Sequence, residues 1–258
     1  MLLPVAGLIR VASVIALFSL GGQTPADVPT LVHHPAHPAS GAVGNDVGYQ
    51  SCSTTLPTGG SFGVVGATAG QPFQASGCLS AEYTWASNLT YRPQYYMNLA
   101  NPGHKSTHWG KGGPRKCHKK PKYDVGCAFD YGFTSAAAAW HYVKDVGSTG
   151  AGRWWLDVEP DNSWGFTRGG VAANLAVIRG ALRYVRHRPH TSAGIYTETV
   201  WWESITGGST HFKKVPVWGG GANNKKHAKA NCKRHSITGG PALLAQWIKA
   251  GVDHDIAC

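Results

Sequence analysis

The stretch RWWLDVEPDNSW, residues 153–164, places two carboxylates inside the pattern of a buried strand. On an extended strand, residues two apart face the same side, so Trp155, Asp157 and Glu159 share one side of this segment. The apolar residues between them share the other side, which suits packing against helices. The stretch therefore predicts a strand that ends near Pro160 and carries two acids on its inward side, at its carboxyl end.

Short apolar or β-branched runs of strand length recur along the chain. They lie at residues 43–50, 62–69, 94–100, 153–159, 192–198, 215–220 and 242–248. Helical patterns separate several of these runs, at about residues 79–86, 130–146 and 170–187. Strands that alternate with helices are typical of a parallel sheet. For about seven or eight strands in a single domain we expect an irregular TIM-like (β/α) barrel of the α/β class, helix-poor in its last third; a doubly wound open sheet is the alternative.

The beginning of the chain does not share this pattern. Residues 1–26 combine an early basic residue, an apolar run and a closing stretch of small residues, which predicts a secretory signal; an anchor that stays uncleaved is the alternative. Residues 27–42 are rich in Pro, His, Ala and Gly, and predict a disordered linker. We therefore expect the barrel at residues 43–258, in a secreted protein that is extracellular or associated with the cell wall.

Six cysteines follow the predicted signal, and an even number in an exported chain favours disulfides. Six thiols allow many pairings, but the expected neighbouring elements favour Cys52–Cys78, Cys117–Cys127 and Cys232–Cys258. A zinc site is the alternative, although no CxxC pair supports it. Adventitious metal binding is expected of the linker histidines, which are His33, His34 and His37. We expect no resident metal or other cofactor.

The formal net charge is +11, and much of it lies in residues 104–124 and 213–234. Both segments are rich in Gly, His and Lys without a helical apolar period, so we expect surface loops. A basic surface attracts polyanions, and a solvated face without a partner is the alternative. Export favours an anionic cell-wall polymer or lipid over nucleic acid.

Two carboxylates as close as Asp157 and Glu159 cannot both ionise comfortably when partly enclosed, so one of them should keep a proton near neutrality. A protonated carboxylic acid beside an ionised one is suited to the cleavage of a glycosidic bond. The structural alternative is that Asp157 caps the following loop and Glu159 pairs with Arg153 or Arg168.

Further acids lie near the two ends of the expected barrel. Asp46 falls in the first candidate strand, and Asp253 and Asp255 lie in GVDHDIAC at the end of the sequence. The first and last strands of a closed barrel are neighbours, and the active sites of such barrels lie at the carboxyl ends of the strands. We therefore expect these acids to converge with those of the central strand.

The order of these motifs resembles that of the family 25 glycoside hydrolases, which are secreted lysozyme-type barrels. The segments that carry the resemblance are NDVGYQ, FGVVGATAG, YYMNLANPG, WLDVE, AGIYTE, PVWGGGA, LLAQW and GVDHD. Together they cover residues 43–258. The chain departs from the family at GATAG, where family members commonly carry a Lys, and in the basic insert at 104–124. Both departures indicate a divergent branch, similar to the glycoside-hydrolase-like barrels of actinobacteria.

The resemblance implies roles for the acids. Glu159 would be the general acid that protonates the leaving oxygen. Asp157 would stabilise the developing positive charge or orient the N-acetyl group of the substrate as the nucleophile. Asp46 and one of Asp253 and Asp255 would tune these groups and position sugar or water. Asp253 is favoured because it holds the place of the late Asp of the family.

Aromatic side chains on the candidate strands fit a glycan site, because flat rings pack against the apolar faces of sugars. The substrate-binding candidates are Tyr49, Tyr96, Trp155, Tyr196, Trp218 and Trp247, together with Gln246. Core packing is the alternative, and we expect it to hold for at least half of the aromatic residues.

The sequence lacks the HExxH and GxxxxGK patterns, which excludes the commonest zinc proteases and nucleotide-binding proteins. Gly-Gly-Ser clusters such as TGGS at 58–61 are interpreted as ordinary turns rather than as the elbow of a serine hydrolase. We expect a monomeric, muramidase-like hydrolase that cleaves β-1,4 linkages of peptidoglycan, held to an anionic wall by its basic loops, with no nucleic acid partner and no stable membrane insertion. A non-catalytic barrel that binds wall glycan is one alternative. A basic exported protein that acts on membranes or other polymers is another.

Overall fold

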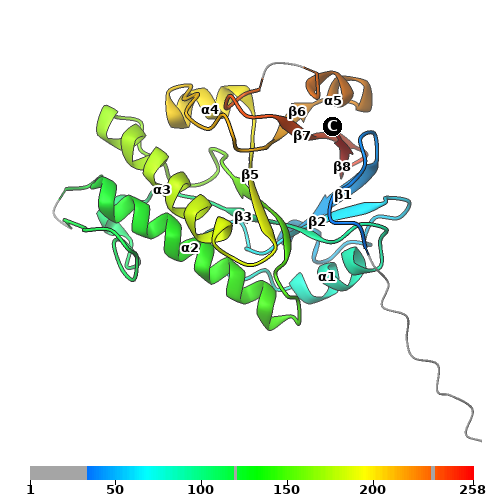
Figure 1. Cartoon of the computed structure of the whole chain (residues 1–258), viewed down its shortest axis with the longest axis horizontal. Helices are drawn as coiled ribbons and strands as arrows, with labels where there is room; N and C mark the ends of the chain where they lie inside the picture. The colour runs from blue at the N-terminus through cyan, green and yellow to red at the C-terminus, as the bar shows by residue number, and fades with distance from the viewer. Residues whose placement is uncertain (1–33, 119–120, 234–235) are drawn as a thin grey trace, which may run out of the picture. The chain divides into compact units, whose positions relative to one another are not determined.

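The computed structural model describes residues 34–118, 121–233 and 236–258. Eight strands close into a barrel in the order in which they follow along the sequence (Figure 1). They are β1 Val43–Val47, β2 Phe62–Gly66, β3 Gln94–Asn98, β4 Gly152–Asp157, β5 Thr191–Thr197, β6 Val217–Ala222, β7 Ala242–Lys249 and β8 Val252–Ala257. Neighbouring strands from β1 to β7 are parallel. The expected α/β barrel is confirmed.

Strand β8 differs from the expectation, because it is antiparallel to both of its neighbours, β7 and β1. Only Ala250 and Gly251 separate it from β7, and both have positive φ, as the tight turn of a β-hairpin requires. A parallel strand would need a much longer crossover. The amino end of β8 therefore lies beside the carboxyl ends of the other strands.

In the described residues, five α-helices accompany the strands: α1 Leu79–Ser87, α2 Val125–Asp145, α3 Arg168–Arg186, α4 Thr199–Thr206 and α5 Lys225–Asn231. The long helices α2 and α3 lie side by side on one flank of the barrel (Figure 1). They approach closely at two glycines: a Cβ at Gly132 or at Gly180 would lie 2.0 Å from a backbone carbonyl oxygen of the other helix. Past β5 the helices α4 and α5 are short, as expected for the last third.

Part of the basic segment 213–234 is helical rather than a loop, since α5 falls within it. The side chain of Asn224 accepts a hydrogen bond from the backbone N–H of His227 and caps the first turn of this helix. The short helix lacks the long apolar period by which α3 was predicted. Among the described residues, no helix is both long and apolar enough to cross a membrane.

Large apolar side chains fill much of the barrel interior below its mouth. Trp155 of β4 packs there with Trp218 of β6, Phe62 and Leu244. Trp154 points outward instead and packs with Trp140 of α2. The alternation of sides expected for β4 is therefore present.

The described part of the predicted linker, residues 34–42, lies against the barrel. The carbonyl oxygen of Pro35 accepts a hydrogen bond from the backbone of Arg92, and the backbone N–H of Gly41 donates to Ala257 at 2.8 Å. These bonds hold the backbone in place, so the disorder expected for residues 27–42 does not extend over this part. The rest of the linker and the predicted signal at 1–26 lie outside the described residues.

All six cysteines form disulfides, with the predicted pairing confirmed. The bonds join Cys52 to Cys78, Cys117 to Cys127, and Cys232 to Cys258. No thiolate is left for the alternative zinc site, since none of the cysteines is free. The second bond ties the basic segment 104–124 to the first turn of α2.

A carboxylate-lined cavity at the mouth of the barrel

A cavity of about 260 Å³ opens at the carboxyl ends of the parallel strands. Four of the predicted acids line it, from strands near the beginning, middle and end of the sequence: Asp46, Asp157, Glu159 and Asp253. Tyr96, Tyr196, Trp218 and Gln246, from the predicted substrate-binding set, line it too. None of the residues that line it is a lysine or an arginine. The Lys that the family commonly carries near the second strand therefore has no counterpart in this lining.

Asp157 is held by a chain of hydrogen bonds across three strands. The side-chain amide of Asn98, at the end of β3, donates to Asp157 Oδ2 at 2.6 Å. The hydroxyl of Thr68 donates to Asn98 Oδ1 at 2.8 Å, and its oxygen accepts the backbone N–H of Asn98. All three side chains are buried. This chain fixes the position of the Asp157 carboxylate and stabilises its charge.

Glu159 follows β4 and is only half-buried, so it is more accessible from the cavity than the buried Asp157. Burial raises the pKa of Glu159, and the acids Asp161 and Glu198 raise it further. Burial and the Glu159 carboxylate raise the pKa of Asp157 well above its ordinary value. The two carboxyl groups are close neighbours, because they share one side of β4 and its end and line the same cavity. They titrate as a pair that retains one proton nearer to neutrality than an isolated acid would.

A second group of acids lies across the cavity. Burial and the charge of Asp253 raise the pKa of Asp46 to about 7. Asp46 Oδ2 accepts a hydrogen bond from Gln246 at 3.0 Å, and Gln246 Oε1 accepts one from the Tyr196 hydroxyl at 2.8 Å. Gln246 therefore orients an acid and a tyrosine at once.

Asp253 and Asp255 share one face of β8 but lie at different depths. Asp253 is near the amino end of β8 and lines the cavity. Asp255 is fully buried, and its Oδ1 accepts a hydrogen bond from the indole N–H of Trp218 at 2.7 Å. Burial and Asp46 raise the pKa of Asp255 well above its usual range. Asp255 thus supports Trp218 and Asp46 from below rather than facing the cavity.

The other predicted substrate-binding residues lie outside the cavity lining. Trp155 is fully buried beneath it, and its indole N–H donates to Gln94. Trp247 points away and stacks on His254, with ring centroids 5.2 Å apart. Tyr49 follows β1 at the rim and is 40% exposed. Core packing accounts for Trp155, because its ring fills the barrel below the acids.

The ion pairs of the structural alternative do not form. Arg153 lies near the amino end of β4, where its guanidinium is over the Trp155 ring at 5.5 Å and contacts His37. Arg168 begins α3 and is exposed. The carboxylate charges that act on Glu159 are not offset by either arginine.

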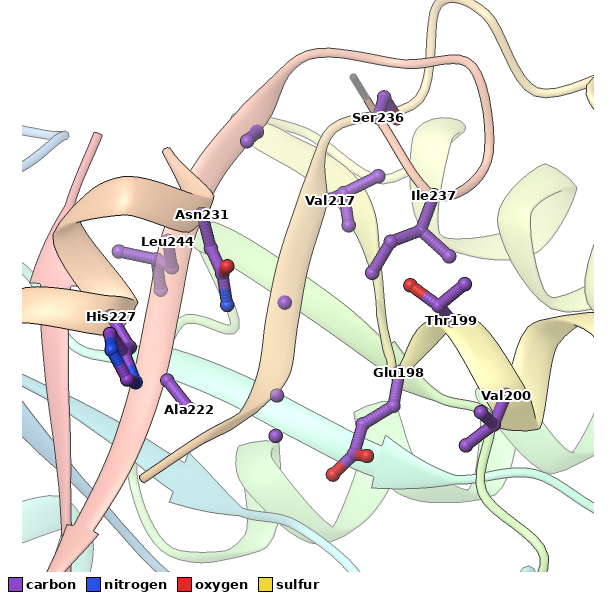
Figure 2. Close-up of a pocket in the computed structure, with 14 residues that line it drawn as sticks. Glu198, Thr199, Val200, Val217, Ala222, His227, Asn231, Ser236, Ile237 and Leu244 are labelled. Atoms are coloured by element: carbon purple, nitrogen blue, oxygen red, sulfur yellow. The ribbon is translucent and has the colours of Figure 1, made fainter. Parts of the chain in front are cut away.

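Sequence reasoning missed Asn98, Thr68 and Glu198. Asn98 and Glu198 lie at the carboxyl ends of β3 and β5, so the location of barrel active sites could have identified them. Glu198 also lines a second cavity, of about 320 Å³, next to strand β6 (Figure 2). In this view, Glu198 and Thr199 lie on one side of the strand, and His227 and Asn231 of α5 on the other.

The second cavity depends on the glycines of β6. A Cβ at Gly221 would lie 2.8 Å from the Glu198 carboxylate, and one at Gly220 would lie 2.9 Å from the Tyr196 hydroxyl. Tyr196 lines the first cavity and Glu198 the second, so the two cavities adjoin across these side chains. Burial raises the pKa of Glu198.

No protein-family model matches the sequence, and a search of curated proteins finds no match. Solved structures do match. A bacterial lysozyme from Streptomyces coelicolor is 19% identical, with a TM-score of 0.52, over 85% of this chain and 93% of that one. A family GH25 lysozyme from Aspergillus fumigatus is 19% identical, with a TM-score of 0.52, over 84% and 93%. A family 25 glycosyl hydrolase from Bacillus anthracis is 12% identical, with a TM-score of 0.55, over 87% and 93%. The resemblance to family 25 glycoside hydrolases is confirmed as a likeness of fold.

Proposed function

We propose that this protein is a secreted, monomeric glycoside hydrolase that cleaves β-1,4 linkages of peptidoglycan in the manner of a muramidase. The observation that carries this assignment is the meeting of Asp46, Asp157, Glu159 and Asp253 in one open cavity whose lining holds no cation. The likeness of fold to lysozymes supports it. Export is supported by the three disulfides, which form in oxidising compartments.

Glu159 is assigned as the general acid, because it is the more exposed member of the proton-sharing pair and burial raises its pKa. Its proton would go to the glycosidic oxygen as the bond to the anomeric carbon breaks. In the free protein the raised pKa of Asp157 favours Asp157 as the holder of the shared proton. For catalysis that proton would pass to Glu159, and the Asn98 amide would stabilise the ionised Asp157 that remains. In that state it would stabilise the positive charge that develops on the sugar.

The closeness of the two carboxyl groups favours a mechanism in which the N-acetyl group of the substrate acts as the nucleophile. Paired acids that act from opposite sides of a glycosidic bond are about 5 Å or more apart. Asp157 and Glu159 instead project from the same side of β4 and its end, and the charge of Glu159 raises the pKa of Asp157, so the two acids would act from one side of the bond. The carbonyl oxygen of the substrate's N-acetyl group would attack the anomeric carbon, oriented by Asp157. Water activated by the Glu159 carboxylate would then complete hydrolysis.

The test is release of reducing ends from purified peptidoglycan. Wild type should release them, and Glu159→Gln should reduce the rate by at least about 100-fold, because loss of a general acid removes a large part of catalysis. Glu203→Gln is the matched control, since Glu203 is an exposed acid on α4 outside both cavities. Equal rates for wild type and Glu159→Gln would refute the role of Glu159. Binding of walls without any turnover would instead support a non-catalytic glycan-binding barrel.

A further inference from the structure

A strongly basic groove lies on the outer flank of the barrel, between α3 and the connection from α4 to β6. It encloses about 710 Å³. Five exposed cations line it: Arg179, Arg183, Arg186, Lys213 and Lys214. The three arginines follow one another at steps of four and three residues, so they project from one face of α3.

No acid offsets these charges. Between residues 162 and 216 the acidic residues are Glu198 and Glu203, and neither lines the groove. The guanidinium of Arg186 donates a hydrogen bond to a backbone carbonyl, that of Lys214, at 3.5 Å. Partial desolvation of its guanidinium by the groove lowers the pKa of Arg186. Like charges gathered without counter-charges repel one another, and a bound anion would relieve that repulsion.

The groove is a built feature rather than a chance meeting of loose side chains. Phe212 anchors the connecting segment: it is 5% exposed and packs edge-on against Trp202, with ring centroids 5.4 Å apart. The guanidinium of Arg179 lies over the same ring at 5.8 Å. Lys213 and Lys214 follow Phe212 directly, so this anchor sets their distance from α3.

The positive surface is elongated. Arg179 also lines a neighbouring cavity of about 410 Å³, together with Arg115 and Lys116. Arg115 is partly balanced there by Asp130, so the excess charge is concentrated on the side of α3 that faces Lys213. Arg179 and Arg183 are one turn apart, which is about 6 Å along the helix axis. Guanidinium groups at this spacing can grip successive phosphates of a chain, each in a bidentate manner.

The lining also indicates which polyanion fits. Single-stranded nucleic acid is usually held by exposed aromatic rings on which bases stack, but Phe212 is buried and covered by Arg179. A membrane-binding surface carries exposed apolar side chains, and none of the exposed large apolar residues in the described chain lines this groove. A flexible polymer that carries phosphates but neither bases nor lipid tails needs no exposed aromatic rings and no exposed apolar side chains, so it fits this lining.

We propose that this groove binds a phosphodiester-linked polymer of the cell wall and holds the protein on its substrate. Its biological setting rests on the proposed hydrolase function. The last turns of α3 and the segment before β6 lie toward the amino ends of the strands. The carboxylate cavity opens at the opposite end, so a polymer in the groove leaves that cavity free.

The test compares two variants that lose the same charge. Arg183→Gln/Arg186→Gln/Lys213→Gln removes three cations from the groove, and Lys225→Gln/Lys226→Gln/Lys229→Gln removes three exposed cations from α5. Binding of the full protein to an inorganic polyphosphate chain is measured by titration over a range of salt concentrations. We expect the groove variant to bind at least about 10-fold more weakly and with a shallower salt dependence, and the α5 variant to stay within about twofold of wild type.

Further arms identify the polymer. Wild type should sediment with intact walls, and less with walls from which the phosphodiester polymers have been removed. Equal weakening in both charge variants would show general charge attraction and overturn the assignment. So would tighter binding to a single-stranded oligonucleotide of equal charge, or to anionic vesicles, than to polyphosphate. Reducing-end release from soluble, phosphate-free glycan should be the same in the groove variant and wild type. If neither releases any, the hydrolase assignment fails while the groove result stands.

Discussion

Asn98→Ala tests whether the chain from Thr68 through Asn98 stabilises the ionised form of Asp157. The substitution removes the amide that donates to Asp157 Oδ2 at 2.6 Å. A hydrogen bond to a charged group contributes about 1.5–3 kcal/mol. Because the amide favours the ionised carboxylate, its loss should raise the pKa of the Asp157–Glu159 pair by about 1–2 units. If Asp157 stabilises the transition state, the same energy corresponds to a loss of about 10- to 100-fold in kcat.

The assay is the rate of reducing-end release as a function of pH. The acidic limb, where the pair becomes fully protonated, should move to higher pH in Asn98→Ala, and kcat should fall more than KM changes. Thr68→Val should move the limb in the same direction by a smaller amount, because it frees Asn98 without removing the amide.

Asn101→Ala is the matched control for Asn98→Ala. Asn101 is a buried asparagine just after β3, and its side chain donates to Asn174 at 2.6 Å, away from the cavity. Its loss should lower stability comparably while leaving the pH profile in place. An unchanged limb in Asn98→Ala, or equal shifts in both asparagine variants, would refute the assigned role of Asn98.

Three further predictions concern charge and packing. Glu198→Gln should move the alkaline limb of the pH profile down by less than about 1 unit, because the Glu198 charge raises the pKa of Glu159; an upward shift would contradict this. Gly132→Ala should destabilise the fold by at least about 2 kcal/mol in thermal or denaturant unfolding, because its Cβ would collide with the α3 backbone. The control Gly169→Ala has open space around it and should not lower the stability. Equal stability of the two variants would contradict the packing of α2 against α3. Glu82 is 1% exposed and burial raises its pKa from 4.5 to about 7, so the folded state keeps a proton that the unfolded state releases. Stability should therefore fall as pH rises from about 4.5 to 7, by at most about 3 kcal/mol from this group, and Glu82→Gln should flatten that fall in melts at several pH values.

Local sequence patterns were sufficient for the direction of side chains on a strand. The period of two in RWWLDVE predicted that Trp155, Asp157 and Glu159 point inward and that Trp154 points outward, as the structure has them. This information is local, because the backbone of a single strand sets which side each residue faces. The expected order of neighbouring elements likewise predicted which cysteines pair.

The tertiary structure decided how deeply each side chain is buried and which residues lie beside it on the neighbouring strands. Asp253 and Asp255 face the same way, but the antiparallel direction of β8 places one in the cavity and buries the other. The bond from Asn98 to Asp157 exists because β3 and β4 pair with these two residues opposite each other, a register that neither strand contains alone. Such pairings depend on long-range packing and strand register, so no single stretch of sequence could have specified them.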